Sequence, residues 1–484
     1  LLLSFCLENT ARALGRQERV IRVAPAHYMA SWVDLPQAVS NLRFVPEMLV
    51  AMLADQEGDY VDQNKDGDET WFAVGRGFED NLLLKVFHKG VLREGPLGDR
   101  TSDRFDETTK VGIDQLLMIR LAQKVGQAPD KLRGKETGGD RVSNQRPIAE
   151  LAARHFSEDL RHFIRGYADA IPRHSFVEML EACMAVGLTT IFTSVVELLF
   201  GWVDTGTIRP KSGQSPGELF VDCSNGVQRS LRAIAEQSMD DFMRRIERIP
   251  VVLMALRLLD YQARYDPSLK KLDIKYTPYA TEWVNLLGDL LKGRRDESRD
   301  VHRDLERYAQ RLTEAFKDEY PEAAEILAND RNQPSPVWRM AEALTFLQGR
   351  KSTQNNVSSL FDSSLLLSRP NGIASKRKVI RTVVGSGRKT RDVRSVILTD
   401  AVLDHLVHLH VLRNGKSGGY RPLAFAEFLS ILHKRYGLCV DVAPPGVSAS
   451  NDLLRENRSS LERRLRDLGL LVGVNDAESM KYLR

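Results

Sequence analysis

The stretch Ala182–Val203, ACMAVGLTTIFTSVVELLFGWV, decides between two very different folds. Its apolar length matches what a membrane-spanning helix requires. It also contains Glu197 and several hydroxyl side chains, and a charge inside hydrocarbon is costly unless it is paired. We therefore expect the buried central helix of a globular protein, and no association with a membrane.

The residues around this stretch have the pattern of a helical domain spanning 147–350. Pro172, Pro250 and Pro321 stand at expected helix boundaries, where proline is favoured because its missing N–H is not needed. The run Val251–Tyr265, VVLMALRLLDYQARY, is apolar enough for a core helix. The sequence predicts a mainly α, multi-domain helical protein.

The flanking regions differ from this helical pattern. A chain of 484 residues is too long for one hydrophobic core. Residues 1–128 alternate strand-like and helix-like patterns and predict a small mixed α/β region. The serine-rich segment Lys351–Ser375 predicts a linker into a separate C-terminal domain at 376–484.

The charge is distributed unevenly along the chain. Residues 376–484 hold 20 basic and 11 acidic side chains, a net charge of +9, whereas residues 1–375 hold 49 against 54. The excess is greatest in 376–394, KRKVIRTVVGSGRKTRDVR, where the one acidic residue is Asp392. Such a patch attracts phosphate backbones whatever the base sequence. An acidic protein partner or a merely solvated surface would use the same residues.

The order of elements in 376–484 predicts a winged-helix-like α+β domain. A basic β-hairpin with a glycine-rich turn comes first, because two runs of β-branched residues flank Gly385–Gly387. We then expect helices at 399–413, 422–436 and 450–468, a short strand at 438–442, and closing strands at 470–474 and 480–483. In a winged helix-turn-helix the third helix enters the DNA major groove.

The third helix has the composition expected for that role. Leu454, Leu461, Leu465 and Leu468 fall on one side of it and form an expected core stripe, with Ser450 as the N-cap. Basic residues fall on another side. The candidate nucleic-acid-binding residues are Arg377, Lys378, Arg388, Lys389, Arg391 and Arg394 on the hairpin, with Arg455, Arg463 and Arg466 on the helix.

An alternative hypothesis is a cysteine-dependent phosphatase. The segment Cys223–Ser230 is similar to the signature of that class, in which Cys223 would attack a phosphate held by Arg229 and by backbone N–H groups. Asp204 would be the acid for the leaving group. Asp222 precedes the cysteine and would raise the pKa of its thiol, which opposes this chemistry.

Other motifs do not support a cofactor or a metal. Two phosphate-loop fragments, at Gly387–Thr390 and Gly415–Ser417, lack the earlier glycine that the motif needs. The loop Asp62–Gly67 resembles a calcium loop, but Ala73 stands where a bidentate glutamate is required. His405 and His408 lie one turn apart without further ligands, and the four scattered cysteines indicate reduced thiols in a cytoplasmic protein.

Three segments carry a resemblance to a known group of proteins: Pro172–Asp241 with its DCSNG turn, Phe428–Gly437 and Leu453–Leu470. They resemble large proteins of bacterial anti-phage defence islands, and those of methylation-associated defence systems come closest. The resemblance implies a prokaryotic cytoplasmic protein that acts on DNA within a multi-protein complex. It transfers no functional residues.

These observations together predict a DNA-binding, non-catalytic subunit that contacts the phosphate backbone through its basic C-terminal residues. Other protein subunits are the expected partners besides DNA. The phosphatase hypothesis stays open as an alternative, and so does a scaffold that docks an acidic protein.

Overall fold

The computed structural model describes residues 148–167, 171, 173–265, 269, 280–383, 387–413, 421–473 and 481–483. Helices dominate these residues, and the expected mainly α fold is confirmed. The expected mixed region over 1–128 and the calcium-like loop within it lie outside the described residues.

Helix α7 (Arg173–Thr205) contains the apolar stretch 182–203. Length and composition alone would let this helix cross a membrane, but 83% of its most apolar segment is buried inside the protein. Its hydroxyls bond back onto the helix: Thr190 Oγ1 donates to the Val186 carbonyl at 2.8 Å and Ser194 Oγ donates to the Thr190 carbonyl at 2.7 Å. These bonds offset the cost of burying polar groups. The burial of α7 is that of a core helix.

The described residues form two compact units, and each unit combines segments distant in the sequence. Among the described residues, the first unit contains 148–153, 195–214 and 246–360, and the second contains those within 154–194, 215–245 and 361–484. The boundaries expected from composition differ from this division. The second unit takes two segments from the expected helical domain at 147–350 and joins them to the C-terminal residues.

The first unit is helical throughout its described residues. Its complete helices are α9 (Ile249–Tyr265), α10 (Ala280–Leu291), α11 (Ser298–Phe316), α12 (Pro321–Ala328) and α13 (Pro336–Leu347), with a short 3₁₀ turn, η2 (Lys211–Gly213). Proline begins both α12 and α13, where its fixed backbone angle suits the first helical turn. The guanidinium of Arg339 is buried on α13 and pairs with Glu306 of α11, which ties these two helices together.

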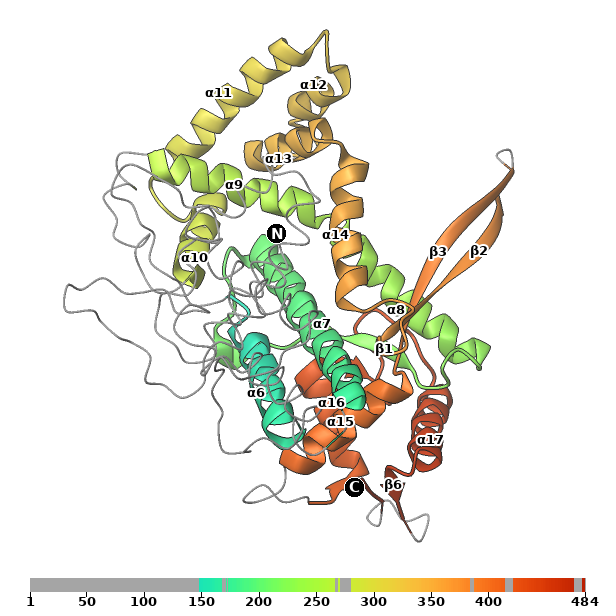
Figure 1. The fold of residues 1–484 in the computed structure, drawn as a ribbon. Helices are drawn as coiled ribbons and strands as arrows, with labels where there is room; N and C mark the ends of the chain where they lie inside the picture. The colour runs from blue at the N-terminus through green and yellow to red at the C-terminus, as the bar shows by residue number, and fades with distance from the viewer. Residues whose placement is uncertain are drawn as a thin grey trace, which may run out of the picture. The chain divides into compact units, whose positions relative to one another are not determined.

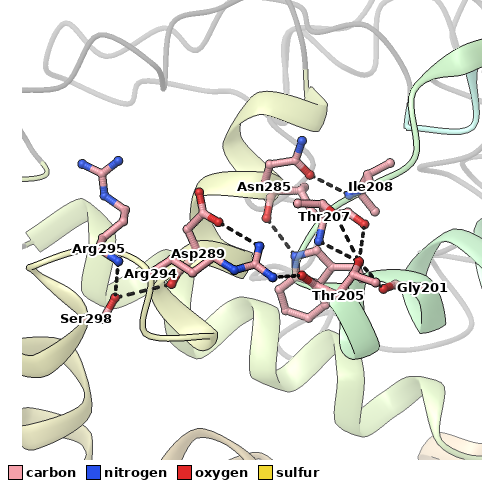
Figure 2. A network of polar contacts seen from close by, with 11 residues as sticks. Gly201, Thr205, Thr207, Ile208, Asn285, Asp289, Arg294, Arg295 and Ser298 are labelled. Atoms are coloured by element: carbon pink, nitrogen blue, oxygen red, sulfur yellow. Dashed lines mark hydrogen bonds and ion pairs between the residues drawn. The ribbon is translucent and has the colours of Figure 1, made fainter.

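Helix α10 closely approaches the end of α7 within the first unit. A Cβ added at Gly288 would lie 1.8 Å from the carbonyl oxygen of Gly206, so only a glycine fits there. A polar network surrounds the approach (Figure 2), in which the Arg294 guanidinium donates to the Thr205 carbonyl and to Asp289. The contact therefore depends on the absence of a side chain at residue 288.

The second unit is built on a four-stranded sheet in the order β2–β3–β1–β5. Its strands are β1 (Leu219–Asp222), β2 (Ala374–Val383), β3 (Gly387–Ile397) and β5 (Leu438–Cys439). Strands β2 and β3 form the predicted hairpin, whereas β1 pairs in parallel with β3 on one side and with β5 on the other. The residues from 376 onward therefore depend on β1, which comes from a distant part of the chain.

The rest of the second unit is helical apart from a small second sheet. Its helices are α6 (Glu150–Tyr167), α8 (Arg229–Ile246), α15 (Asp400–Arg413), α16 (Phe425–Tyr436) and α17 (Asn451–Asp467). The short strands β4 (Leu423–Ala424), β6 (Leu471–Val472) and β7 (Tyr482–Leu483) pair antiparallel in the order β4–β7–β6. The helices and strands expected after the hairpin are therefore present, with bounds shifted by a few residues.

The segment expected to be a linker, 351–375, is mostly helix. Helix α14 (Arg350–Ser364) covers its first half and β2 begins near its end. Buried apolar residues follow the spacing of a helix face, at Val357, Leu360, Phe361 and Leu365. The linker prediction was wrong because it was based on the serine content of the segment and did not take account of this apolar spacing.

The approach of α10 to α7 predicts opposite effects at two glycines. Gly288→Ala should lower the free energy of unfolding by about 1–3 kcal/mol or more, because its methyl group collides with backbone. Gly201→Ala, on α7 with nothing within 4 Å of the added Cβ, should be neutral or stabilise by up to about 1 kcal/mol. Urea denaturation of the two variants measures both. Equal stability of the two variants would contradict the close contact.

Candidate functional site

The register of the hairpin assigns its basic side chains to two faces. Residues directly opposite one another on paired strands share a face, and successive residues alternate. The pairs Lys376–Arg394, Lys378–Asp392 and Thr382–Arg388 therefore belong to a first face, and Arg377–Val393, Val379–Arg391 and Arg381–Lys389 belong to a second face.

The second face is fastened to α8 by two ion pairs. Arg377 donates to the carboxylate of Glu236 from Nε and from Nη2, the latter at 2.7 Å, and Arg391 Nη2 lies 3.0 Å from Asp240. Glu236 and Asp240 are four residues apart and so lie on the same side of α8. The hydrogen bond with Glu236 raises the pKa of Arg377 above its ordinary value. These two arginines hold the hairpin against the helix.

The first face is fastened by a third arginine. Arg394 makes two bonds to Asp362, at 2.6 and 2.8 Å, and its side chain is only 15% exposed. Hydrogen bonding to Asp362 raises the pKa of Arg394. On the same face, Lys376 Nζ lies 2.7 Å from Asp392 and lowers the pKa of that carboxyl. Near its base, the hairpin is a charge-compensated structure.

The outer half of the hairpin, residues 380–390, has a different composition. It contains Arg381, Arg388 and Lys389 and no acidic residue. The two strands run out from β1 as a narrow ribbon (Figure 1). Of the predicted nucleic-acid-binding residues on the hairpin, Arg377, Arg391 and Arg394 thus have carboxylate partners. The sequence holds one signal for the partners on α8: Glu236 and Asp240 are four residues apart, so both carboxylates fall on the same side of a helix.

Helix α17 carries the remaining predicted residues. Ser450 is its N-cap, as expected, because its hydroxyl accepts from the Leu453 N–H. Leu461 and Leu465 are fully buried, but Leu468 is 38% exposed, so the expected core stripe ends one turn early. The three predicted arginines of this helix are all exposed.

The surroundings of those three arginines differ. Arg466 pairs with Glu462 at 2.6 Å, and Arg455 lies 3.7 Å from Asp452 in a pair that is almost fully solvated. Exposed pairs of this kind contribute little to stability. The structure gives Arg463 no carboxylate partner among the described residues. Arg455 and Arg463 are therefore the most available cations on the exposed side of α17.

A buried asparagine joins α17 to the sheet. The Asn457 side chain is wholly buried; its amide nitrogen donates to the carbonyls of Val221 and Val440 at 2.8 Å each. Its amide oxygen accepts from the Cys223 N–H at 2.9 Å. One side chain thus satisfies three backbone groups at the ends of β1 and β5. Sequence reasoning placed Asn457 in the third helix without assigning it this role.

The turn after β1 has features that oppose the phosphatase hypothesis. Cys223 is fully buried, and burial raises the pKa of its thiol far above the ordinary value. The Asp222 carboxylate accepts the N–H groups of Ser224 and Gly226, which a bound phosphate would need. Arg229 is exposed, and Asp204 belongs to the first compact unit while Cys223 belongs to the second. The geometry does not favour a thiolate nucleophile here.

The histidines of α15 do not converge on a metal site. His405 packs edge-on against Phe163, and burial lowers its pKa to about 4. His408 pairs with Asp404 on its own helix at 2.9 Å, and the His410 ring lies 2.8 Å from the Tyr436 hydroxyl. Each of the three rings therefore has a different environment.

The bonds of Asn457 predict a large effect from a nearly isosteric change. Asn457→Asp replaces the donating amide nitrogen by an acceptor that faces two carbonyl oxygens. Each buried polar group left without a partner costs about 1–3 kcal/mol, so the free energy of unfolding should fall by several kcal/mol. Asn451→Asp, at the exposed first position of the same helix, should be neutral or slightly stabilising. Chemical denaturation of both variants makes the comparison.

The bidentate ion pair between Arg394 and Asp362 predicts that Arg394 stabilises the fold. Arg394→Gln leaves Asp362 without its bidentate partner and should lower the free energy of unfolding by about 1.5–3 kcal/mol. Lys378→Gln, at an exposed hairpin position, should change it by less than about 0.5 kcal/mol. Thermal melting of both variants tests this. A fully stable Arg394 variant would argue that this pair is solvated in solution.

Comparison with known proteins identifies a family. A search of the curated proteins and a search of the solved structures each found no match. A family model described as "Methylation-associated defense system protein MAD7" matches residues 15–484, which is nearly the entire chain. This confirms the resemblance to methylation-associated defence proteins. The chain belongs to the family of methylation-associated defense system protein MAD7.

Proposed function

We propose that this protein is a DNA-binding, non-catalytic subunit of an anti-phage defence complex in the bacterial cytoplasm. It would hold the phosphate backbone with the outer half of the hairpin and the exposed side of α17. The observation that carries the proposal is the order of elements from α15 to β7, combined with the exposed arginines Arg455 and Arg463 of α17.

The order of elements supports a winged-helix interpretation. Helix α15, strand β4, helix α16, the short strand β5, helix α17 and strands β6 and β7 follow one another, and β7 pairs between β4 and β6. In this arrangement α17 is the third helix, the element that enters the major groove in helix-turn-helix proteins.

The ion pairs of the hairpin reduce the set of cations that we expect to contact DNA. Arg377, Arg391 and Arg394 are already bonded to carboxylates, so their contribution to phosphate binding should be small. We assign the phosphate contacts to Arg381, Arg388 and Lys389, because the outer half contains no acidic residue in its sequence, together with Arg455 and Arg463 of α17. Contacts to phosphates carry no sequence information, so we expect weak base preference.

Membership of a defence-system family supports action together with other components. The proposal leaves catalysis to those components, because the one candidate nucleophile, Cys223, is buried as a neutral thiol. The closest competing function is a scaffold whose basic surface docks an acidic protein.

The proposal predicts the salt dependence of binding to a mixed-sequence DNA duplex. Five phosphate contacts give a slope of about −4.5 for log K against log salt concentration. The triple variant Arg381→Gln, Arg388→Gln, Lys389→Gln removes three contacts, so its slope should be near about −1.8. Fluorescence anisotropy of the full-length chain at four salt concentrations measures both slopes.

A charge-matched control separates local contact from net charge. The triple variant Arg299→Gln, Arg303→Gln, Arg311→Gln removes the same charge from exposed positions of α11 and should keep the wild-type slope. An unchanged slope in the hairpin variant, or an equal change in both variants, would overturn the assignment. Retention of a protein partner after nuclease treatment, with no duplex binding, would favour the scaffold.

A further inference from the structure

Three potential metal ligands from separate elements meet at one edge of the four-stranded sheet. Glu218 directly precedes β1, His433 lies in the last turn of α16, and Cys439 ends β5. Their ligand atoms all lie within 4.8 Å of one another. All three belong to the second compact unit. Nothing in the proposed DNA-binding surface uses them.

The separations are close to those between ligands of one metal ion. His433 Nε2 lies 3.3 Å from Glu218 Oε1, and Cys439 Sγ lies 3.8 Å from the other carboxylate oxygen, Glu218 Oε2. Zinc binds nitrogen and oxygen at about 2.0–2.2 Å and sulfur at about 2.3 Å, which sets tetrahedral edges of roughly 3.3–3.7 Å. The three side chains could therefore contact one ion with small adjustments.

The backbone holds these ligands in place through a tight approach beside them. Gly437 has φ +72°, and a Cβ there would lie 2.3 Å from the Gly217 carbonyl oxygen. The Leu219 N–H donates to the Gly437 carbonyl at 2.8 Å, and Leu219 pairs with Leu438 across the two strands. Glu218 and Cys439 are thus fixed by adjacent strand positions.

The donor set selects the kind of ion. One thiolate, one imidazole and one carboxylate suit Zn²⁺ or Co²⁺, whereas Mg²⁺ and Ca²⁺ prefer oxygen ligands alone. Cys439 is fully buried, while the side chains of Glu218 and His433 are 32% and 31% exposed. An ion could therefore reach the cluster from solvent and keep a water molecule as its fourth ligand.

We propose that Glu218, His433 and Cys439 form a binding site for a zinc-type divalent ion, with three protein ligands and one solvent position. Binding releases the thiol proton of Cys439 to solvent and leaves a thiolate on the metal. The ion would link the start of β1 to α16 and β5. The site would then stabilise the sheet that bears the hairpin.

Co²⁺ titration of the full-length, metal-stripped protein tests the site. One equivalent of Co²⁺ should bind per chain and produce a thiolate-to-cobalt charge-transfer absorption in the near ultraviolet. Cys439→Ser should abolish that absorption, and His433→Ala should weaken binding by about tenfold or more. Zn²⁺ should displace the Co²⁺ and raise the melting temperature of the wild-type protein.

Glu427→Gln is the matched control, because it removes an exposed carboxylate from the first turn of the same helix. It should bind Co²⁺ as the wild type does. His433→Ala keeps the test decisive if Cys439→Ser fails to fold, since its side chain is partly exposed. The proposal is overturned if Co²⁺ binds without the thiolate absorption, if both ligand variants bind as the wild type does, or if no stoichiometric binding occurs.

Discussion

The amide of Asn457 fixes the geometry on which the second compact unit depends. It bonds to β1, to the residue after β1 and to the residue after β5, and so sets the position of α17 relative to the sheet. An amide suits this place because it offers a donor and an acceptor without a charge, and an unpaired buried charge would be far more costly. Through this one side chain, the exposed arginines of α17 keep a defined relation to the hairpin, which the same sheet carries.

The positive charge of the hairpin has two separate roles along its length. Near β1 the arginines face carboxylates of α8 and α14, and these bonds orient the ribbon. Beyond that point the sequence supplies cations without acids. Bonded arginines contribute rigidity, and a rigid ribbon loses less conformational entropy when its outer cations meet a polyanion. The ion pairs near β1 would therefore favour the binding of a polyanion by the cations of the outer half.

Much of the second unit could be predicted from local patterns. The β-branched runs around Gly385–Gly387 indicated the hairpin, and Ser450 indicated the start of α17, because both signals are set by neighbouring residues. The partners of Arg377 and Arg394 could not be predicted in this way. Glu236 and Asp362 are far from them in sequence, and only the folded sheet brings these charges together.

The missed features share the same cause. The serine content of α14 led to the prediction of a linker, although the buried residues of this helix recur at three- and four-residue spacing. Glu218, His433 and Cys439 come from three elements, whereas ligand motifs are recognised in sequence by short spacing. The role of Asn457 also depended on the end of β1, which lies more than two hundred residues away in the sequence.

The central position of β1 has a consequence for how the protein is made. Val221 pairs with Val396, a residue synthesised 175 positions later. Until the ribosome has delivered β3 and β5, the apolar residues Leu219, Phe220 and Val221 have no strand to join. Such long-range pairing slows folding, and it leaves an unpaired strand that can aggregate with other chains exposed on the nascent chain. The newborn polypeptide can therefore complete this sheet only after β3 and β5 have left the ribosome, and until then a chaperone that covers strand edges would limit aggregation.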